Sequence, residues 1–217
     1  MKVRLIILFL ALGVASCKLP YIKKDVFEEK AELPRDEAPH FKNSLEWWYF
    51  TGHLKDEEKN KTLGVEYVVF HFNPTNIKGG WMVNMAVSDP ENEAFYYDHQ
   101  FFPKSKYEFN ELPLNFNWSK KQFKSSLKGQ NGSYELAAHF SKDSISMNLK
   151  TRSEKEVVLH DGIGYENYGD IARAGYYSFP RLKTEGQINL NGERFNVNGN
   201  LWYDRQWNCS GVFDKKV

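Results

Sequence analysis

The chain has 217 residues, of which 41% are hydrophobic and 26% are charged, and its 29 basic residues nearly balance its 28 acidic ones. No basic stripe or cluster stands out, which argues against a nucleic-acid partner. The length is sufficient to bury a hydrophobic core without disulfides.

The N-terminus has the pattern of a secretory signal. A positive stretch at residues 1–4 precedes an apolar run at residues 5–14, and the small residues Ala15 and Ser16 follow. This run is too short for a membrane span, which takes about 20 helical residues. We therefore expect residues 1–16 to be a signal peptide.

Residues 14–17, Val-Ala-Ser-Cys, resemble the lipobox of bacterial lipoproteins, which implies that Cys17 carries lipid and becomes the N-terminus. The alternative is an ordinary signal peptide cut near Ser16. Lys18, by resemblance to Gram-negative lipoproteins, favours the outer membrane. The expected location is the cell envelope, with the lipid as the contact to the membrane, and Cys209 then remains as the single free thiol.

Residues 17–40 contain three prolines and show no periodicity, so we expect a lipidated cysteine and a flexible tether. As a coil, such a segment spans roughly 25 Å. Loss of residues 1–16 removes Lys2 and Arg4 from the 29 basic residues and none of the 28 acidic ones, which leaves a formal net charge of −1.

From residue 41 to residue 217 the pattern is that of one β domain. Short runs rich in aromatic and β-branched residues indicate antiparallel strands, at 46–54, 63–72, 81–88, 94–102, 133–140, 144–151, 176–183, 187–190 and 194–204. Asn131-Gly132 and Asn191-Gly192 predict tight hairpins, because type I′ turns require positive φ at both central residues. Successive hairpins without helical periodicity favour an all-β antiparallel barrel.

Three segments carry a family resemblance. Residues 46–54 read Glu-Trp-Trp-Tyr-Phe-Thr-Gly-His-Leu, residues 175–182 read Gly-Tyr-Tyr-Ser-Phe-Pro-Arg-Leu, and residues 201–207 read Leu-Trp-Tyr-Asp-Arg-Gln-Trp. They resemble the AttH/CrtC family of lipocalin-like proteins, which includes carotenoid 1,2-hydratases, so-called secreted hydrolases and fungal pericyclases. The turn at residues 160–164, His-Asp-Gly-Ile-Gly, fits the same resemblance.

The resemblance implies a fold of two lipocalin-like barrels. It covers residues 41–207, and the chain stops ten residues after Trp207, where the second barrel of the family would begin. We therefore expect the first barrel only, in a chain truncated before a second barrel, with that barrel or a partner chain missing.

In the hydratase branch, the resemblance implies an acid at Asp204 that protonates a polyene, with Trp202 and Tyr177 beside it. Such an acid must be buried to stay protonated. Strand alternation places Asp204 on the polar face with Trp202 and Gln206, whereas Leu201 and Tyr203 face the core. This predicts a solvated Asp204, or one facing a domain interface.

Two departures from the family pattern argue against a catalytic role. Gln206 stands where many relatives have Glu, and no histidine lies near Tyr177 as it does in the hydratases. The remaining ligand or interface candidates are Glu46, Trp48, Arg181, Gln206 and Trp207. Arg181 is expected to pair with Glu46 or Asp204 or, by the resemblance, to close the barrel end.

No cofactor and no metal site are expected, because no His-x-His or Cys/His cluster occurs. The histidines are interpreted as ordinary strand residues, and no Gly-x-Ser-x-Gly serine elbow accompanies the hydrolase label. The abundant aromatic residues fit an apolar ligand cavity, but they also fit an ordinary barrel core.

Three functions remain open. The first is an envelope lipoprotein that binds an apolar small molecule such as a lipid or isoprenoid. The second is a lyase of the hydratase type that uses Asp204, and the third is a remnant of a two-barrel protein. The sequence favours the non-catalytic binder.

Overall fold

The structure is a computed structural model that describes residues 30–73, 79–103, 112–140, 144–168 and 173–208. The predicted lipidation site, Cys17, and the thiol of Cys209 lie outside these residues. No helix in the described ranges is long and apolar enough to cross a membrane.

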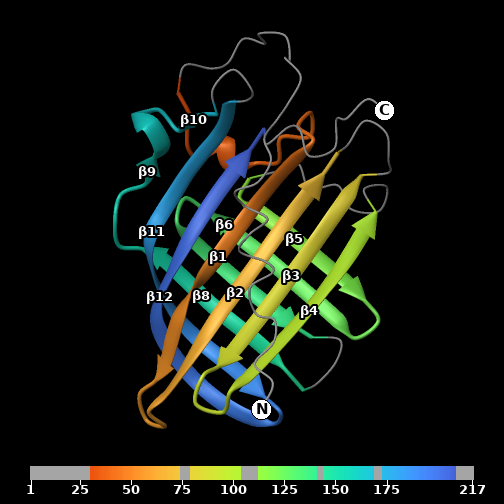
Figure 1. Ribbon diagram of the computed structural model, residues 1–217, viewed down its shortest axis with the longest axis vertical. Coiled ribbons are helices and arrows are strands. Elements are labelled where there is room, and N and C mark those ends of the chain that lie inside the picture. The colour runs from red at the N-terminus through yellow and green to blue at the C-terminus, as the bar shows by residue number, and fades with distance from the viewer. Residues whose placement is uncertain (1–29, 74–78, 104–111, 141–143, 169–172, 209–217) are drawn as a thin grey trace.

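One antiparallel sheet forms the domain, and its strands follow the order β4-β3-β2-β1-β12-β11-β8-β7-β6-β5. In Figure 1, β11, β12, β1, β2, β3 and β4 lie side by side nearest the viewer, and β5 to β8 cross behind them. The bounds are β1 (Leu45–Asp56), β2 (Lys61–Phe72), β3 (Gly80–Asp89), β4 (Ala94–Pro103), β5 (Leu114–Lys120), β6 (Phe123–Gln130), β7 (Ser133–His139), β8 (Ser146–Ser153), β11 (Arg173–Leu190) and β12 (Glu193–Trp207). The short strands β9 (Val158–Leu159) and β10 (Tyr165–Asn167) pair with β11. The predicted all-β antiparallel barrel is confirmed, and it is nearly closed, because the sheet is a path that ends at β4 and β5.

Both predicted Asn-Gly turns are present. Asn131 and Gly132 have φ values of 54° and 81°, and Asn191 and Gly192 have φ values of 51° and 91°. They join β6 to β7 and β11 to β12. The sequence missed β5 and β6, and it divided β11 into two strands. The division fell at residues 184–186, Thr-Glu-Gly, because a glycine weakens a strand pattern, but β11 continues through it. A register shift between Phe179 and Leu182 also changes the inward side of β11 from odd to even residues.

The alternation predicted for β12 is also present, because its register with β1 continues through Gly199 without a bulge. Its inward side chains, which include Leu201, Tyr203 and Trp207, are at most 5% exposed. Aromatic rings from opposite walls meet inside the barrel. Trp48 of β1 lies 5.1 Å from Phe116 of β5.

The tether predicted for residues 17–40 ends earlier than expected. From Ala31 onward the chain packs against the barrel, with Ala31 4% exposed and Glu37 fully buried. Residues 31–44, which we call the strap, include a 3₁₀ turn, η2 (Arg35–Glu37). The strap has no periodicity because single contacts to barrel side chains hold it in place, and such contacts leave no repeating pattern in the sequence.

Candidate functional site

The predicted site residues lie in two places on opposite sides of the barrel wall. Glu46, Trp48, Tyr177 and Trp207 point inward at the barrel end that the strap covers. Trp202, Asp204 and Gln206 lie on the outer face of β12. Arg181 lies with neither group, because it is exposed at the register shift of β11.

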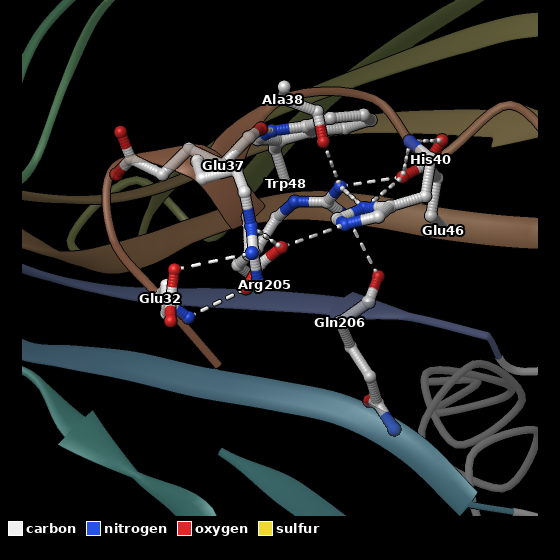
Figure 2. A network of polar contacts seen from close by, with 10 residues as sticks. Glu32, Glu37, Ala38, His40, Glu46, Trp48, Arg205 and Gln206 are labelled. Carbon is white, nitrogen blue, oxygen red and sulfur yellow. Dashed lines mark hydrogen bonds and ion pairs between the residues drawn. The ribbon is translucent and has the colours of Figure 1, made fainter. Parts of the chain in front are cut away.

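The inner group is organised around Arg205, which is fully buried. Its Nη2 donates to Glu46 Oε2 at 2.6 Å and to the Ala38 carbonyl of the strap at 2.9 Å. Its Nη1 donates to the Gln206 carbonyl at 3.0 Å. Figure 2 shows these contacts converging on one guanidinium from the strap, β1 and β12.

Aromatic rings enclose the same cation. The Arg205 guanidinium carbon lies 3.9 Å from the ring centre of Trp48 and 5.4 Å from that of Trp207. The His40 ring of the strap stacks on Trp207 at 4.7 Å. Cation–π contacts contribute more in a desolvated site than at an exposed one, so these rings help a buried charge to remain stable.

Glu46 is fully buried, and burial alone would raise its pKa. The charge of Arg205 and the hydrogen bonds with His40 and His71 outweigh burial and hold the pKa of Glu46 well below its ordinary value. The backbone amide of His40 donates to both carboxylate oxygens, at 3.0 and 2.9 Å. Glu46 is therefore an anion that fixes the strap to the barrel.

A second buried carboxylate, Glu37, lies beside this pair. It accepts a 2.7 Å hydrogen bond from the Asn131 amide and a short one from the Tyr134 hydroxyl. Burial raises the pKa of Glu37, and these two bonds offset part of that rise. The hydroxyls of Tyr177 and Tyr203 are buried in the same cluster and make no hydrogen bond.

The predicted pairing of Arg181 with Glu46 was therefore wrong, because the partner of Glu46 is Arg205. The signal was present in the sequence, since alternation along β12 puts residues 203, 205 and 207 on the inner face. Glu37 was missed because the strap shows no pattern. Its burial depends on Asn131 and Tyr134, which lie far from it in the chain.

On the outer face, Asp204 is half-buried and forms part of a polar chain. Ser178 lies directly opposite it on β11, is 1% exposed and donates a short hydrogen bond to Asp204 Oδ1. His160 Nε2 lies 3.0 Å from Ser178 Oγ. The His160 ring stacks on Tyr176 at 3.5 Å. His160 and Ser178 were not predicted as site residues.

This order of groups differs from that of a serine-hydrolase triad. In a triad, the histidine takes the serine proton and the carboxylate binds the other nitrogen of the histidine. Here the Ser178 proton is directed to Asp204, so His160 Nε2 must be the donor to Ser178 Oγ. The serine oxygen is therefore not activated as a nucleophile, and the arrangement is a hydrogen-bonded chain that ends on a carboxylate.

Exposed aromatic side chains also lie on the outer face, on β12 and, beyond the three strands β1 to β3, on β4. Trp202 is 41% exposed, and on β4 Phe95, Tyr97 and Phe101 are 67%, 48% and 45% exposed. Register places Trp47, Phe70, Met82 and Phe101 in one row across β1, β2, β3 and β4. Gln206 begins this row and donates to the Tyr168 hydroxyl at 3.1 Å.

Neither group resembles a metal centre. In the ranges that the structure describes, no three His, Cys, Asp or Glu side chains are grouped so that they could hold a metal ion. The two carboxylates of the inner group are engaged by donors of the protein itself, as described above.

Comparisons with known proteins agree on the fold. The family model described as AttH-like matches residues 26–216. The structure of an AttH protein from Nitrosomonas europaea is similar, with a TM-score of 0.70 and 22% identity, over 90% of this chain and 59% of that one. Kievitone hydratase from Nectria haematococca has a TM-score of 0.54 and 16% identity, over 82% of this chain and 52% of the other.

At these identities the two structures establish the fold alone. The chain spans less than two thirds of the length of either protein. No curated protein matches the chain significantly.

Proposed function

The chain belongs to the AttH-like family, and from this premise and the outer face of the barrel we propose that it is a lipid-anchored envelope protein that binds an apolar ligand. The ligand is a lipid or an isoprenoid-like molecule. The observation that carries the proposal is the set of exposed aromatic side chains on the outer face, because exposed apolar surface marks binding sites. Among them, Phe101 ends the apolar row that crosses four strands from Trp47.

The close packing of aromatic rings inside the barrel supports a ligand site on the outer face. Rings of opposite walls are in contact, as in the pairs Trp48–Phe116 at 5.1 Å and Phe50–Tyr134 at 5.3 Å. With the strap in place, an apolar molecule would have to separate these rings. The outer face offers the rings of Trp202 and Trp47 without such a cost.

The binding experiment uses the fluorescent apolar probe N-phenyl-1-naphthylamine. We expect the wild-type protein to enhance the fluorescence of this probe, and Trp202→Ala to weaken binding about fivefold through loss of buried apolar area. Asn200→Ala, on the same face of β12, is the matched control. Equal binding by all three proteins would contradict an outer site at Trp202.

The lipid anchor is tested by the intact mass of the native protein from membranes. A species that begins at Cys17 and carries acyl chains is expected. An unmodified species cut near Ser16 would exclude the anchor. A much larger lipidated species would instead support a second barrel on this chain, as the lengths of the two related structures suggest.

An acid–base enzyme of the hydratase type is the second candidate. The hydrogen-bonded chain from His160 through Ser178 to Asp204 favours it, because it offers a path for a proton to the carboxylate. The test is turnover of an apolar polyene by wild-type protein and by Asp204→Asn. Product formation that is unchanged in Asp204→Asn would eliminate this role.

A further inference from the structure

Rows of side chains cross the outer face of β12, β1, β2, β3 and β4, which lie side by side nearest the viewer in Figure 1. Strand register aligns one such row in the order Trp202, Thr51, Glu66, Ala86 and Tyr97. The end members, Trp202 and Tyr97, are 41% and 48% exposed. A small residue lies between each of them and Glu66, so the row holds a carboxylate between two exposed aromatic rings.

The adjacent row holds a second carboxylate, Asp204. Register places Tyr49 directly opposite Asp204 on β1, and the Tyr49 hydroxyl donates a 3.2 Å hydrogen bond to Glu66 Oε2. The Tyr49 side chain thus connects the two carboxylates. On its other side, the Asp204 row borders the apolar row that runs from Trp47 to Phe101.

Neither carboxylate is neutralised by a cation. The three rows contain no lysine or arginine, and in the part of the chain that the structure describes none forms an ion pair with Glu66 or Asp204. Burial raises the pKa of Glu66, and the hydrogen bond from Tyr49 opposes that rise. An ionised carboxylate that is partly removed from water without a counter-ion is costly, and a bound cation would lower that cost.

The phenols of this face also lie in a negative field. Burial raises the pKa of Tyr49 to about 12, and the charges of Glu66 and Asp204 add to the rise. Burial likewise raises the pKa of Tyr97, with a further contribution from Glu66. The pKa of Tyr176, beside Asp204, is raised by burial and then by the charge of Asp204. The charges that act on these three rings are therefore negative ones.

An organic cation fits this face better than a metal ion does. In the described ranges, no three acidic, histidine or cysteine side chains are grouped to hold a metal ion, which takes several oxygen or nitrogen ligands at once. Aromatic faces attract alkylammonium groups through cation–π contacts, and carboxylates supply the counter-charge. The neighbouring apolar row offers surface for a hydrocarbon chain.

We propose that the outer face binds an apolar organic cation, an alkylammonium whose head lies over Tyr49 between Glu66 and Asp204. Its hydrocarbon chain follows the apolar row from Trp47 to Phe101. This inference rests on the function proposed above, because it narrows the ligand of the same face from any apolar molecule to an apolar cation.

Isothermal titration calorimetry with decyltrimethylammonium and with decan-1-ol, both below their micellar concentrations, measures the preference for the cation. The wild-type protein should bind the ammonium about tenfold more tightly than the alcohol, because rings and carboxylates favour only the charged head. Glu66→Gln should reduce this ratio about threefold. Glu135→Gln should keep the ratio and is the matched control, because Glu135 is an exposed acid on β7 that pairs with Lys150 at 3.1 Å.

A second pair of variants tests the ring of Tyr49 and leaves Glu66 in place, so it also serves if Glu66→Gln is unstable. Tyr49→Phe keeps an aromatic face and should keep most of the preference for the ammonium. Tyr49→Leu should reduce that preference about threefold. Tetramethylammonium, which has no hydrocarbon chain, should bind at least about tenfold more weakly than decyltrimethylammonium.

The outcomes separate this inference from the proposed function. Equal affinity for the ammonium and the alcohol would overturn the inference, as would equal effects of Glu66→Gln and Glu135→Gln, or of Tyr49→Phe and Tyr49→Leu. Failure of N-phenyl-1-naphthylamine to bind would instead refute the outer site itself. Binding of that probe without a preference for the ammonium would remove only the cation and leave an apolar site in place.

Discussion

Arg205 shows how much of this protein depends on one side chain. Its guanidinium joins the strap at Ala38, the first strand at Glu46 and its own strand at Gln206, and all these contacts are buried or nearly so. Removing one partner of a buried ion pair leaves the other charge uncompensated, and this costs more than the pair itself contributes.

The first prediction follows from this asymmetry. Arg205→Met should lower the free energy of unfolding by about 3–5 kcal/mol, because Glu46 loses its buried counter-ion. Urea unfolding measures the change. Arg181→Met is the control, since this exposed arginine on the adjacent strand should change stability by no more than about 0.5 kcal/mol. The double variant Arg205→Met, Glu46→Gln should recover part of the loss.

The second prediction concerns acid. The folded-state pKa of Glu46 lies below its ordinary value of about 4.5, and that of Asp36 is lowered to about 2 because hydrogen bonds from His40 and Arg35 outweigh burial. Depressed acid pKa values give stability that is present above the ordinary pKa and is lost as pH falls through the folded one. Unfolding free energies measured from pH 6 to pH 2 should decline, and less steeply in Glu46→Gln.

At the scale of elements, the strap and the shifted strand β11 decide where side chains point. The strap closes one barrel end without strand pairing, through Glu37, Ala38 and His40. The register shift in β11 turns Arg181 outward and returns Leu182 to the core. Both features depend on contacts with distant strands, so the alternation of side chains along the sequence cannot predict them.

The third prediction separates the charge of Glu37 from its hydrogen bonds. Because burial raises the folded pKa of Glu37, the folded state favours the neutral acid, and the cost of its charge is relieved as pH falls through that raised value. At pH 7, Glu37→Gln should therefore be at least as stable as the wild type. Glu37→Ala should lose about 1–3 kcal/mol, because it leaves the Tyr134 hydroxyl and the Asn131 amide without an acceptor. Urea unfolding of the three proteins measures these differences. If Glu37→Gln is as unstable as Glu37→Ala, the charge of Glu37 does not destabilise the folded state.

At the scale of the whole molecule, the sheet is a path with two ends. Among the described residues β4 pairs only with β3, and β5 only with β6, whereas β1 and β12 lie in the middle of the path. Side chains close part of the seam, because Phe102 of β4 lies 6.4 Å from Trp118 of β5. Strands with one neighbour open at lower free energy than strands with two.

The fourth prediction is therefore a gradient of amide protection. Native-state hydrogen exchange should be fastest in β4 and β5 and slowest in β1 and β12, because only the central strands are bonded on both sides. The strap should exchange faster than any central strand. Protection in β4 equal to that in β12 would show that the two ends of the sheet are joined more firmly than their pairing indicates.

The sequence alone determined the all-β class, the Asn-Gly hairpins, the two faces of β12 and the family. These follow from local rules, since turn chemistry and period-two alternation act over a few residues. Residues 114–120 and 123–130 obey the same alternation, yet Asn, Ser and Lys fill their outer faces, and this polar composition concealed β5 and β6.

Only the tertiary structure decided which residues form the sites. The Arg205–Glu46 pair joins residues 159 positions apart, and the contact of Glu37 with Tyr134 spans 97 positions. Ser178, His160 and Asp204 come together because β11 lies between β9 and β12. Local periodicity gives the face of a strand but not its neighbour, so partners across the sheet and beneath the strap become known only when the barrel is closed.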